Sequence, residues 1–502
     1  MDYLYDSLRE YCKEDYYPFH MPGHKRRLGT LGDPFSFDIT EIEGFDNLHH
    51  AEGLLLEAQE RANALYGAEE TFFLVNGSTA GILSAIGACA PEGRILMARN
   101  SHKAAYHGVF LNRLEAAYLY PAQQGEINGP IRAADVERAL EKEPGIRAVY
   151  VTSPTYDGVV SPIREIAELA HDRGIPLIVD EAHGAHFGMH PFFPESAVKQ
   201  GADIVIHSIH KTLPSLTQTA LLHVNGKLAD RRRLKKLLGI FQSSSPSYVL
   251  MASADQCVRL MQERGTELME AYAGRLKRFR ASVRDLQIVK ILDTDDPSKI
   301  LISVRDASKR AGTEEEWNGR RLCGLLREKY RLELELEAGS YGLALTSLAD
   351  DDEGFRRLSA ALHEIDAGLL RERGDHQEIA GEIAGERGAL EAETLEKGAA
   401  GSWAYKEKPE ESQVCMTIAK AEAARQEKRR LPDCAGRISG EYVYLYPPGI
   451  PLIVPGERIR REMLAQWEAY RRSGYALQGP EDYAMKELWV VCEQECETEE
   501  GR

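Results

Sequence analysis

Residues 176–213, PLIVDEAHGAHFGMHPFFPESAVKQGADIVIHSIHKTL, contain two short apolar runs that each end in polar side chains. The first run, Pro176–Val179, is followed by Asp180, and the second, Asp203–His207, leads to Lys211 four residues later. Continuous apolar runs of this length are typical of strands buried on both faces of a mainly parallel sheet. Because open α/β sheets bind ligands at the carboxyl ends of their strands, we expect Asp180 and Lys211 to face one cleft.

Further apolar runs on both sides of this stretch predict the rest of the sheet. These runs are Thr71–Val75, Arg94–Met97, Ala117–Leu119, Arg147–Thr152 and Ala220–Val224. Helical segments separate several of them, at Leu54–Tyr66, Ala80–Ala90 and Pro162–Arg173. Seven strands with intervening helices predict one large α/β domain around a mainly parallel sheet.

A glycine turn, NGSTAG at residues 76–81, lies between the first expected strand and a helix. Backbone N–H groups, hydroxyls and the positive end of the helix dipole at such a turn can bind a phosphate. Alternatively, Ser78 or Thr79 only caps the helix. The turn by itself favours the capping role.

The phosphate turn, the strand-end carboxylate and the strand-end lysine together predict a pyridoxal-phosphate (PLP) enzyme. PLP needs all three, because its phosphate, pyridine nitrogen and aldehyde lie at separate points of one rigid molecule. A single loop lysine is usually a surface charge, so the combination carries the prediction. The run Asp180-Glu181-Ala182-His183 also resembles the magnesium-binding box of helicases, but no G-x-x-x-x-G-K-[ST] loop accompanies it.

Composition restricts the class of protein further. The formal net charge of −17 over 502 residues argues against a nucleic-acid partner and is compatible with a cationic substrate. The N-terminus has no apolar signal sequence, and no run of 18 apolar residues could span a membrane. Eight scattered cysteines without a C-x-x-C pair are expected to be reduced thiols. We therefore expect a cytoplasmic protein.

Changes of pattern along the chain divide it into five regions. They are an N-terminal arm (1–40), the large domain (41–280), a small α+β region (281–370), a polar linker or poorly packed segment (371–412) and a C-terminal domain (413–502). Within the small region, we expect strands at Lys299–Val304 and Leu332–Leu336 and a helix around Glu314–Lys329.

Nine sequence blocks resemble the Orn/Lys/Arg decarboxylases, which are fold type I (aspartate-aminotransferase-like) PLP enzymes. The blocks are FHMPGHK (19–25), DITEIEGFDNLHH (38–50), FFLVNGSTAG (72–81), ARNSHKA (98–104), TSPTYDG (152–158), VDEAHGAHF (179–187), SIHKTL (208–213), QSSSPSY (242–248) and YPPGIPLIVPGE (446–457). The resemblance implies an α/β fold type I domain with a smaller α+β C-terminal domain. Larger family members carry an N-terminal receiver-like domain, and this chain is similar to the short form.

The resemblance also implies a role for each matching residue. Lys211 forms the Schiff base with PLP, Asp180 pairs with the pyridine nitrogen, and His102 stacks on the ring. The phosphate ligands are Ser78, Thr79, Ser208 and His210. His183 lies near the phenolic oxygen, and Ser243 contacts the phosphate of a neighbouring subunit, since the family builds its sites at a homodimer interface. Lys211 or His210 donates the proton to Cα, and we favour Lys211.

The implied reaction is decarboxylation of a basic amino acid (arginine, lysine or ornithine) in polyamine metabolism. Asp157 and Glu457 are candidate acceptors for the distal cation of the substrate. The alternatives are another fold type I enzyme, an aminotransferase or a lyase, and a PLP-binding protein without turnover.

A metal site is not expected. His183, His186 and His190 have helical spacing, but glycine and proline residues between and after them argue against a helix.

Overall fold

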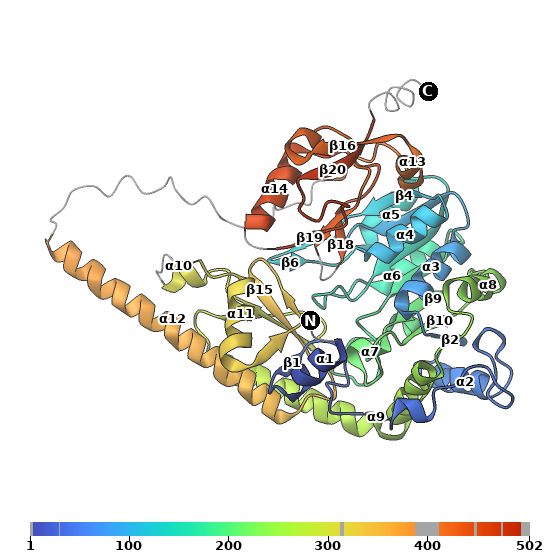
Figure 1. Cartoon of the computed structure of the whole chain (residues 1–502), viewed down its shortest axis with the longest axis horizontal. Coiled ribbons are helices and arrows are strands. Elements are labelled where there is room, and N and C mark those ends of the chain that lie inside the picture. Colours follow the sequence, from blue (N-terminus) through green and yellow to red (C-terminus); the bar gives the residue numbers. More distant parts are fainter. Residues whose placement is uncertain are drawn as a thin grey trace.

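The computed structural model describes residues 4–29, 31–311, 316–386, 411–445, 449–472 and 475–492. Its centre is a seven-stranded sheet in the order β2-β10-β9-β8-β7-β3-β4 (Figure 1). The strands are β2 (Glu70–Leu74), β3 (Arg94–Ala98), β4 (Glu115–Leu119), β7 (Ile146–Thr152), β8 (Leu177–Asp180), β9 (Ile204–His207) and β10 (Ala220–Val224). β10 is antiparallel to β2 and β9, and all other pairs are parallel. The predicted mainly parallel, seven-stranded sheet is confirmed.

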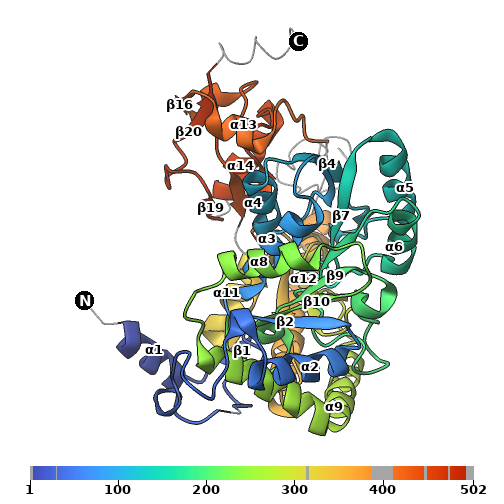
Figure 2. The same cartoon turned by 90° about the vertical axis from the view of Figure 1, so that its right-hand side faces the viewer.

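Alternate strand residues pack against helices on opposite faces of this sheet. Ile95 and Met97 of β3 belong to one core cluster, with the helices α3 (Gly77–Cys89), α4 (Lys103–Leu111) and α8 (Arg231–Phe241). Leu96 and Ala98 belong to another, with α5 (Ala133–Lys142) and α6 (Ile163–His171). Figure 2 shows these two groups of helices on either side of the strands. Burial on both faces explains why the strands read as continuous apolar runs.

A third cluster joins the large domain to the small one through the helix α9 (Tyr248–Ser282). The large-domain helix α2 (Leu54–Tyr66) packs on α9. The small sheet has the order β11-β12-β15-β14, with β11 (Lys290–Leu292), β12 (Lys299–Ser303), β14 (Leu336–Glu337) and β15 (Tyr341–Leu345). Around it lie α10 (Ala307–Ala311), α11 (Gly319–Tyr330), β13 (Leu332–Leu334) and α12 (Asp352–Glu386). Residues 371–386 of the predicted linker thus continue α12, and residues 387–410 lie outside the described residues.

The N-terminal arm packs on the small domain. After α1 (Leu4–Lys13), β1 (Tyr17–Phe19) pairs in parallel with β13. The chain then reaches the large domain, where the backbone N–H of Gly23 donates to the carbonyl of His210 at 2.7 Å. A Cβ on Gly23 would lie 2.6 Å from the carbonyl oxygen of Leu213, so this close approach requires glycine. The arm is therefore held against the short helical segment that carries Lys211.

The C-terminal region has a core of its own, centred on the buried Trp467. Its elements are α13 (Ile418–Ala423), β16 (Gln426–Arg430), β17 (Val443–Leu445), β18 (Ile450–Ile453), α14 (Arg461–Arg472), β19 (Leu477–Gln478) and β20 (Glu487–Val491). It lies beside α4 and β4 of the large domain, near the hairpin of β5 (Gln123–Gln124) and β6 (Ile127–Asn128) (Figure 1). Among the described residues, no helix combines the length and the apolar character needed to cross a bilayer.

Candidate active site

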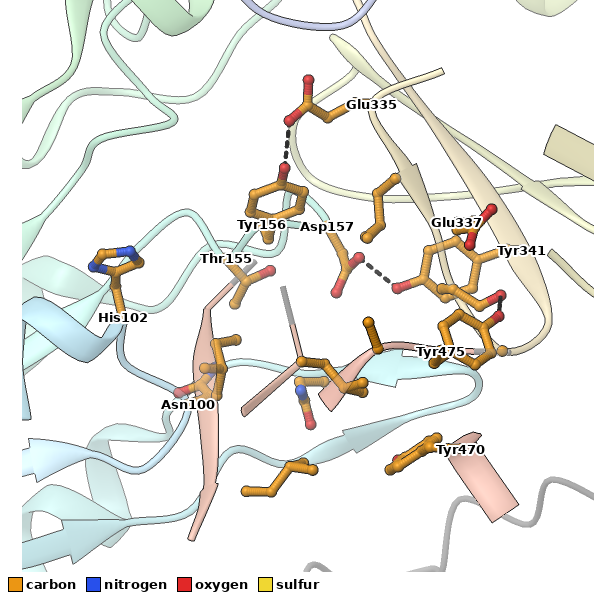
Figure 3. Close-up of a pocket in the computed structure, with 18 of the residues that line it drawn as sticks. Asn100, His102, Thr155, Tyr156, Asp157, Glu335, Glu337, Tyr341, Tyr470 and Tyr475 are labelled. Carbon is orange, nitrogen blue, oxygen red and sulfur yellow. Dashed lines mark hydrogen bonds between the residues drawn. The ribbon is translucent and has the colours of Figure 1, made fainter. Parts of the chain in front are cut away.

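A cleft of about 2200 Å³ lies where the three parts of the chain meet. The large domain lines it with the ends of β7 and β8, the residues that follow β9 and the start of α3. The small domain contributes the segment from Glu333 to Tyr341, and the C-terminal region contributes β18 and α14. Figure 3 shows some of these side chains, among them Tyr156 after β7, Glu335 of the small domain and Tyr470 of α14. All predicted site residues except Ser243 line this one cleft.

Lys211 lies in the short helix α7 (Ile209–Thr212), directly after β9. Its Nζ is 2.9 Å from Nε2 of His183. Loss of hydration lowers the pKa of Lys211, and the charge of Asp180 raises it in part. Burial and the charge of Lys211 lower the pKa of His183 well below its usual value, so this ring is neutral. A lysine with a lowered pKa can act as a nucleophile toward a carbonyl group.

Asp180 is the last residue of β8 and is buried. The hydroxyl of Tyr150 donates to Oδ2 at 3.1 Å, and the N–H of Ala182 donates to Oδ1 at 3.2 Å. Burial raises the pKa of Asp180, and the charge of Lys211 lowers it in part. A buried carboxylate held by two neutral donors can accept a proton-bearing ring nitrogen as its ionic partner.

The phosphate-binding prediction fits the start of α3. Asn76 occupies the N-cap position but makes no side-chain capping bond within the described residues, and neither Ser78 nor Thr79 is the cap residue. The capping alternative for these two hydroxyls is therefore wrong, and the first N–H groups of α3 lie at the cleft. The buried Oγ of Ser208 has no hydrogen-bond partner among the described residues. Such a hydroxyl beside a helix N-terminus fits a phosphate oxygen.

His102 and His210 also present neutral rings to the cleft. His102 precedes α4, and its Nδ1 accepts from the N–H of Ala104 at 3.2 Å. Burial, together with the charge of Lys211, lowers the pKa of His102 to about 3. His210 bonds through Nδ1 to the carbonyl of Thr219 at 2.7 Å, and burial lowers its pKa to about 4. A neutral, flat imidazole such as His102 is suited to stacking on an aromatic ring.

PLP therefore fits the residues present. Lys211 would bind its aldehyde, Asp180 its pyridine nitrogen, and the start of α3 with Ser208 its phosphate. Nδ1 of His183, buried and without a partner among the described residues, is available for a further polar contact.

Three other residues considered in the sequence analysis, Ser243, His186 and His190, lie in other surroundings. Ser243 is exposed outside the cleft, where its carbonyl bonds to His49 at 2.8 Å, so its predicted contact with a neighbouring subunit stays a prediction. His186 pairs with Asp296 at 3.2 Å, and His190 pairs with Glu270 at 2.8 Å. These two histidines therefore face carboxylates on different elements.

Glu457, a candidate acceptor for the substrate cation, is instead paired within the protein. Its Oε2 is 3.1 Å from the guanidinium of Arg99, and both side chains are almost fully buried. Arg99 also donates to the carbonyl of Pro451 at 2.8 Å. The pair therefore ties the loop before His102 to the C-terminal region and favours a structural role for Glu457, whose role as an acceptor of the substrate cation stays a prediction.

Replacing Glu457 with alanine should lower the free energy of unfolding by about 3–5 kcal/mol, because Arg99 would stay buried without its counter-ion. The matched control is Glu468→Ala, which removes an exposed partner of Arg471 and should cost less than about 1 kcal/mol. Urea denaturation of both variants measures the difference. Equal losses would show that the buried pair does not stabilise this contact.

Sequence reasoning missed several residues that line the cleft. Tyr156 packs on His183 with ring centres 4.6 Å apart, and its hydroxyl donates to Glu335 at 2.5 Å. Tyr341 donates to Asp157 at 2.6 Å. Tyr156 directly precedes Asp157 in the block 152–158, and this position in the sequence could have marked it as a cleft residue. Glu335 and Tyr341 lie in a region with little motif resemblance.

Comparison with known proteins agrees with this geometry. Sequence profiles of the "Orn/Lys/Arg decarboxylase, major domain" and "C-terminal domain" match residues 3–317 and 402–477. An arginine decarboxylase of Bacillus anthracis is 30% identical over 98% of this chain and 97% of its own length. The lysine decarboxylase LdcA of Pseudomonas aeruginosa is 27% identical over 58% of this chain and 44% of its own.

A solved structure supports the fold assignment. The constitutive lysine decarboxylase of Escherichia coli superposes with a TM-score of 0.72 at 19% identity, over 97% of this chain and 81% of that one. This likeness shows a shared fold, whereas the profile match over most of the chain shows descent. The chain thus belongs to the Orn/Lys/Arg decarboxylases, a family of PLP-dependent carboxy-lyases that act on basic amino acids.

Proposed function

We propose that this chain is an arginine decarboxylase that binds PLP at Lys211. The observation that carries the proposal is the placement of Lys211 Nζ 2.9 Å from His183, in the same cleft as the buried Asp180. Arginine is favoured over lysine because the arginine decarboxylase of Bacillus anthracis is 30% identical to this chain, whereas the lysine decarboxylases of Pseudomonas aeruginosa and Hafnia alvei are 27% and 23% identical.

Each residue of the cleft has a distinct role in this proposal. When bound, PLP would supply an electron sink for the bond to the carboxylate that breaks at Cα. Asp180 would keep the ring nitrogen protonated, which would strengthen this electron withdrawal. His102 and His183 would hold the ring. Lys211 would hold the cofactor covalently and supply the proton that Cα needs after loss of the carboxylate.

Several neutral donors would hold the phosphate of the cofactor. We assign this contact to Ser78, Thr79 and Ser208, which line the cleft. His210, the fourth predicted ligand, already donates its Nδ1–H to Thr219, so its ring would have to be protonated at Nε2 to join them. Ser78 and Thr79 lie in the first turn of α3. The positive end of the helix dipole there would stabilise the doubly charged phosphate even without a paired cation. Ser243 completes the contact from a second subunit.

A homodimer is part of the same proposal. Ser243 is exposed, and several large apolar side chains in residues 33–56 and on α8 are exposed as well: Phe35, Ile42, Phe45, Leu54 and Ile240. We assign these side chains to the surface that the second chain covers, because a contiguous exposed apolar patch is typical of a protein interface. The mass of the protein in solution tests this assembly. We further place the enzyme in the cytoplasm and its amine product in polyamine metabolism.

Purified, PLP-loaded protein is expected to release CO2 from arginine faster than from lysine or ornithine. The three substrates are assayed in parallel, and the amine products are identified by mass spectrometry. Release from lysine or ornithine alone would overturn the substrate assignment. A keto acid in place of CO2 would overturn the reaction and favour an aminotransferase.

A further inference from the structure

Two glutamine side chains hold the residue that precedes the phosphate turn (residues 76–81). This residue, Val75, directly follows β2 and is buried. Its N–H donates to Oε1 of Gln242 at 2.8 Å, and its carbonyl accepts from Nε2 of Gln218 at 2.7 Å. Both backbone groups of Val75 are therefore satisfied by side chains from distant parts of the chain, one at the end of α8 and one just before β10.

Gln242 reaches Val75 along the edge of the large sheet. In the described sheet β2 has β10 as its one strand partner, and an edge strand has backbone groups left for other partners. The buried amide of Gln242 also donates to the carbonyl of Phe73 at 3.4 Å. Gln59 of α2 accepts from the N–H of Phe73 at 3.0 Å. Two buried glutamines thus cap this edge, Gln242 at Val75 and Gln59 two residues earlier.

Gln218 holds Val75 from a strained backbone. Its φ is +84°, a left-handed value that is costly for a residue with a Cβ. Of the described non-glycine residues with such a φ, Gln218 alone lines the cleft. The turn around it is fixed by Thr219, whose N–H and hydroxyl both donate to the carbonyl of Leu216, at 3.2 and 2.8 Å. Strain that the surroundings enforce in this way is typical of ligand sites.

The strained turn also lies against the phosphate turn itself. A Cβ on Gly77 would be in ordinary contact with the carbonyl oxygen of Gln218, at 3.8 Å. On the other side of Gln218, the carbonyl of Thr219 accepts from Nδ1 of His210 at 2.7 Å. The turn therefore joins the phosphate turn to α7, the helix that carries the lysine of the cleft.

We infer that Gln218 and Gln242 are positioning residues for the phosphate of PLP. This inference rests on the proposed contact of that phosphate with Ser78 and Thr79, and it deepens that proposal. Donors bind a phosphate oxygen well only within narrow limits of distance and angle. The position of Val75 sets where the first turn of α3 begins, and so where its donors point. The two glutamines fix Val75 at both of its backbone groups and act on the phosphate through it.

Pyridoxal, which lacks the phosphate, separates this role from a general effect on the fold. The full-length protein is freed of cofactor and titrated with PLP and with pyridoxal, and the visible absorbance of the bound ligand gives both dissociation constants. Gln218→Gly should weaken PLP binding about tenfold, as for loss of one hydrogen bond, and leave pyridoxal binding unchanged. Glycine adopts the φ of residue 218 without strain, so this variant should keep its Tm.

Gln242→Met should weaken PLP binding by a similar factor, again without an effect on pyridoxal. Its matched control is Gln59→Met, which removes the glutamine that caps the same edge at Phe73 and should leave the preference for PLP over pyridoxal intact. Equal weakening of both ligands in Gln218→Gly would overturn the inference. So would an unchanged PLP affinity in a folded variant of Gln218 or Gln242, or a lost preference in Gln59→Met. If either methionine variant does not fold, Gln218→Gly decides alone.

A double variant, Ser78→Ala with Thr79→Ala, separates the inference from the proposed phosphate contact. If the double variant keeps the full preference for PLP, the proposed contact is wrong and the inference falls with it. If the double variant loses this preference while Gln218→Gly keeps it, the inference alone is wrong. The titration needs no turnover, so absence of CO2 release from every basic amino acid would overturn the proposed reaction without changing this reading.

Discussion

Replacing Lys211 with alanine is expected to abolish covalent attachment of PLP and to lower kcat by about a hundredfold to ten-thousandfold or more. Loss of a positioned acid–base group typically lowers the rate by this factor. Loss of the covalent bond to the cofactor should lower kcat further. Lys211 is the one lysine among the described residues that line the cleft. Borohydride reduction followed by peptide mass spectrometry measures the attachment, and the visible absorbance of the bound cofactor gives an independent reading.

The fold should survive this substitution. The amine of Lys211 makes one hydrogen bond to a described side chain, to His183, and its removal relieves the desolvation that lowers the lysine pKa. Lys199→Ala, on the exposed surface, is the control and should retain the full reduced adduct. An adduct that persists in Lys211→Ala at unchanged stoichiometry would show that another lysine binds the cofactor.

The sheet could be predicted from the sequence because each strand is buried on both faces. Ala220–Val224 was placed correctly to the residue, and Leu54–Tyr66 likewise for α2. The direction of β10 was not predictable, since an antiparallel strand and a parallel strand that are both buried have the same apolar run. The helix expected from Glu314 begins at Gly319, because the side chain of Asn318 accepts from the N–H of Arg321 and caps it there.

The site could be predicted only where its residues follow strand ends. Asp180 and Lys211 come from neighbouring parallel strands, so the sheet brings them to one edge. Glu335 bonds Tyr156 across 179 positions of sequence, and nothing in the spacing of either residue predicts that contact. The strand expected at Leu332–Leu336 is interrupted at Glu335, which leaves its side chain in the cleft. Contacts between domains were therefore the part that sequence patterns could not supply.

Asp180→Asn is expected to retain PLP at Lys211 yet to lower kcat by about a hundred- to a thousandfold, the range for removing one preorganised electrostatic group. Asparagine has nearly the shape of aspartate, and its carbonyl oxygen can still accept from the N–H of Ala182, while its amide NH2 can donate to the hydroxyl of Tyr150. It has no negative charge, so it cannot stabilise a protonated ring nitrogen. The substitution thus separates the charge of Asp180 from its packing.

The roles of charge and hydrogen bonding can be told apart with Tyr150→Phe. This variant removes the hydroxyl that donates to Asp180 but keeps the carboxylate, so its kcat should fall by about tenfold, as for one hydrogen bond to a charged group. Steady-state kinetics and the absorbance of the bound cofactor are measured for both variants at the same pH. A near-normal kcat in Asp180→Asn would contradict the ion pair with the ring nitrogen. Equal losses in the two variants would mean that the position of Asp180, more than its charge, supports turnover.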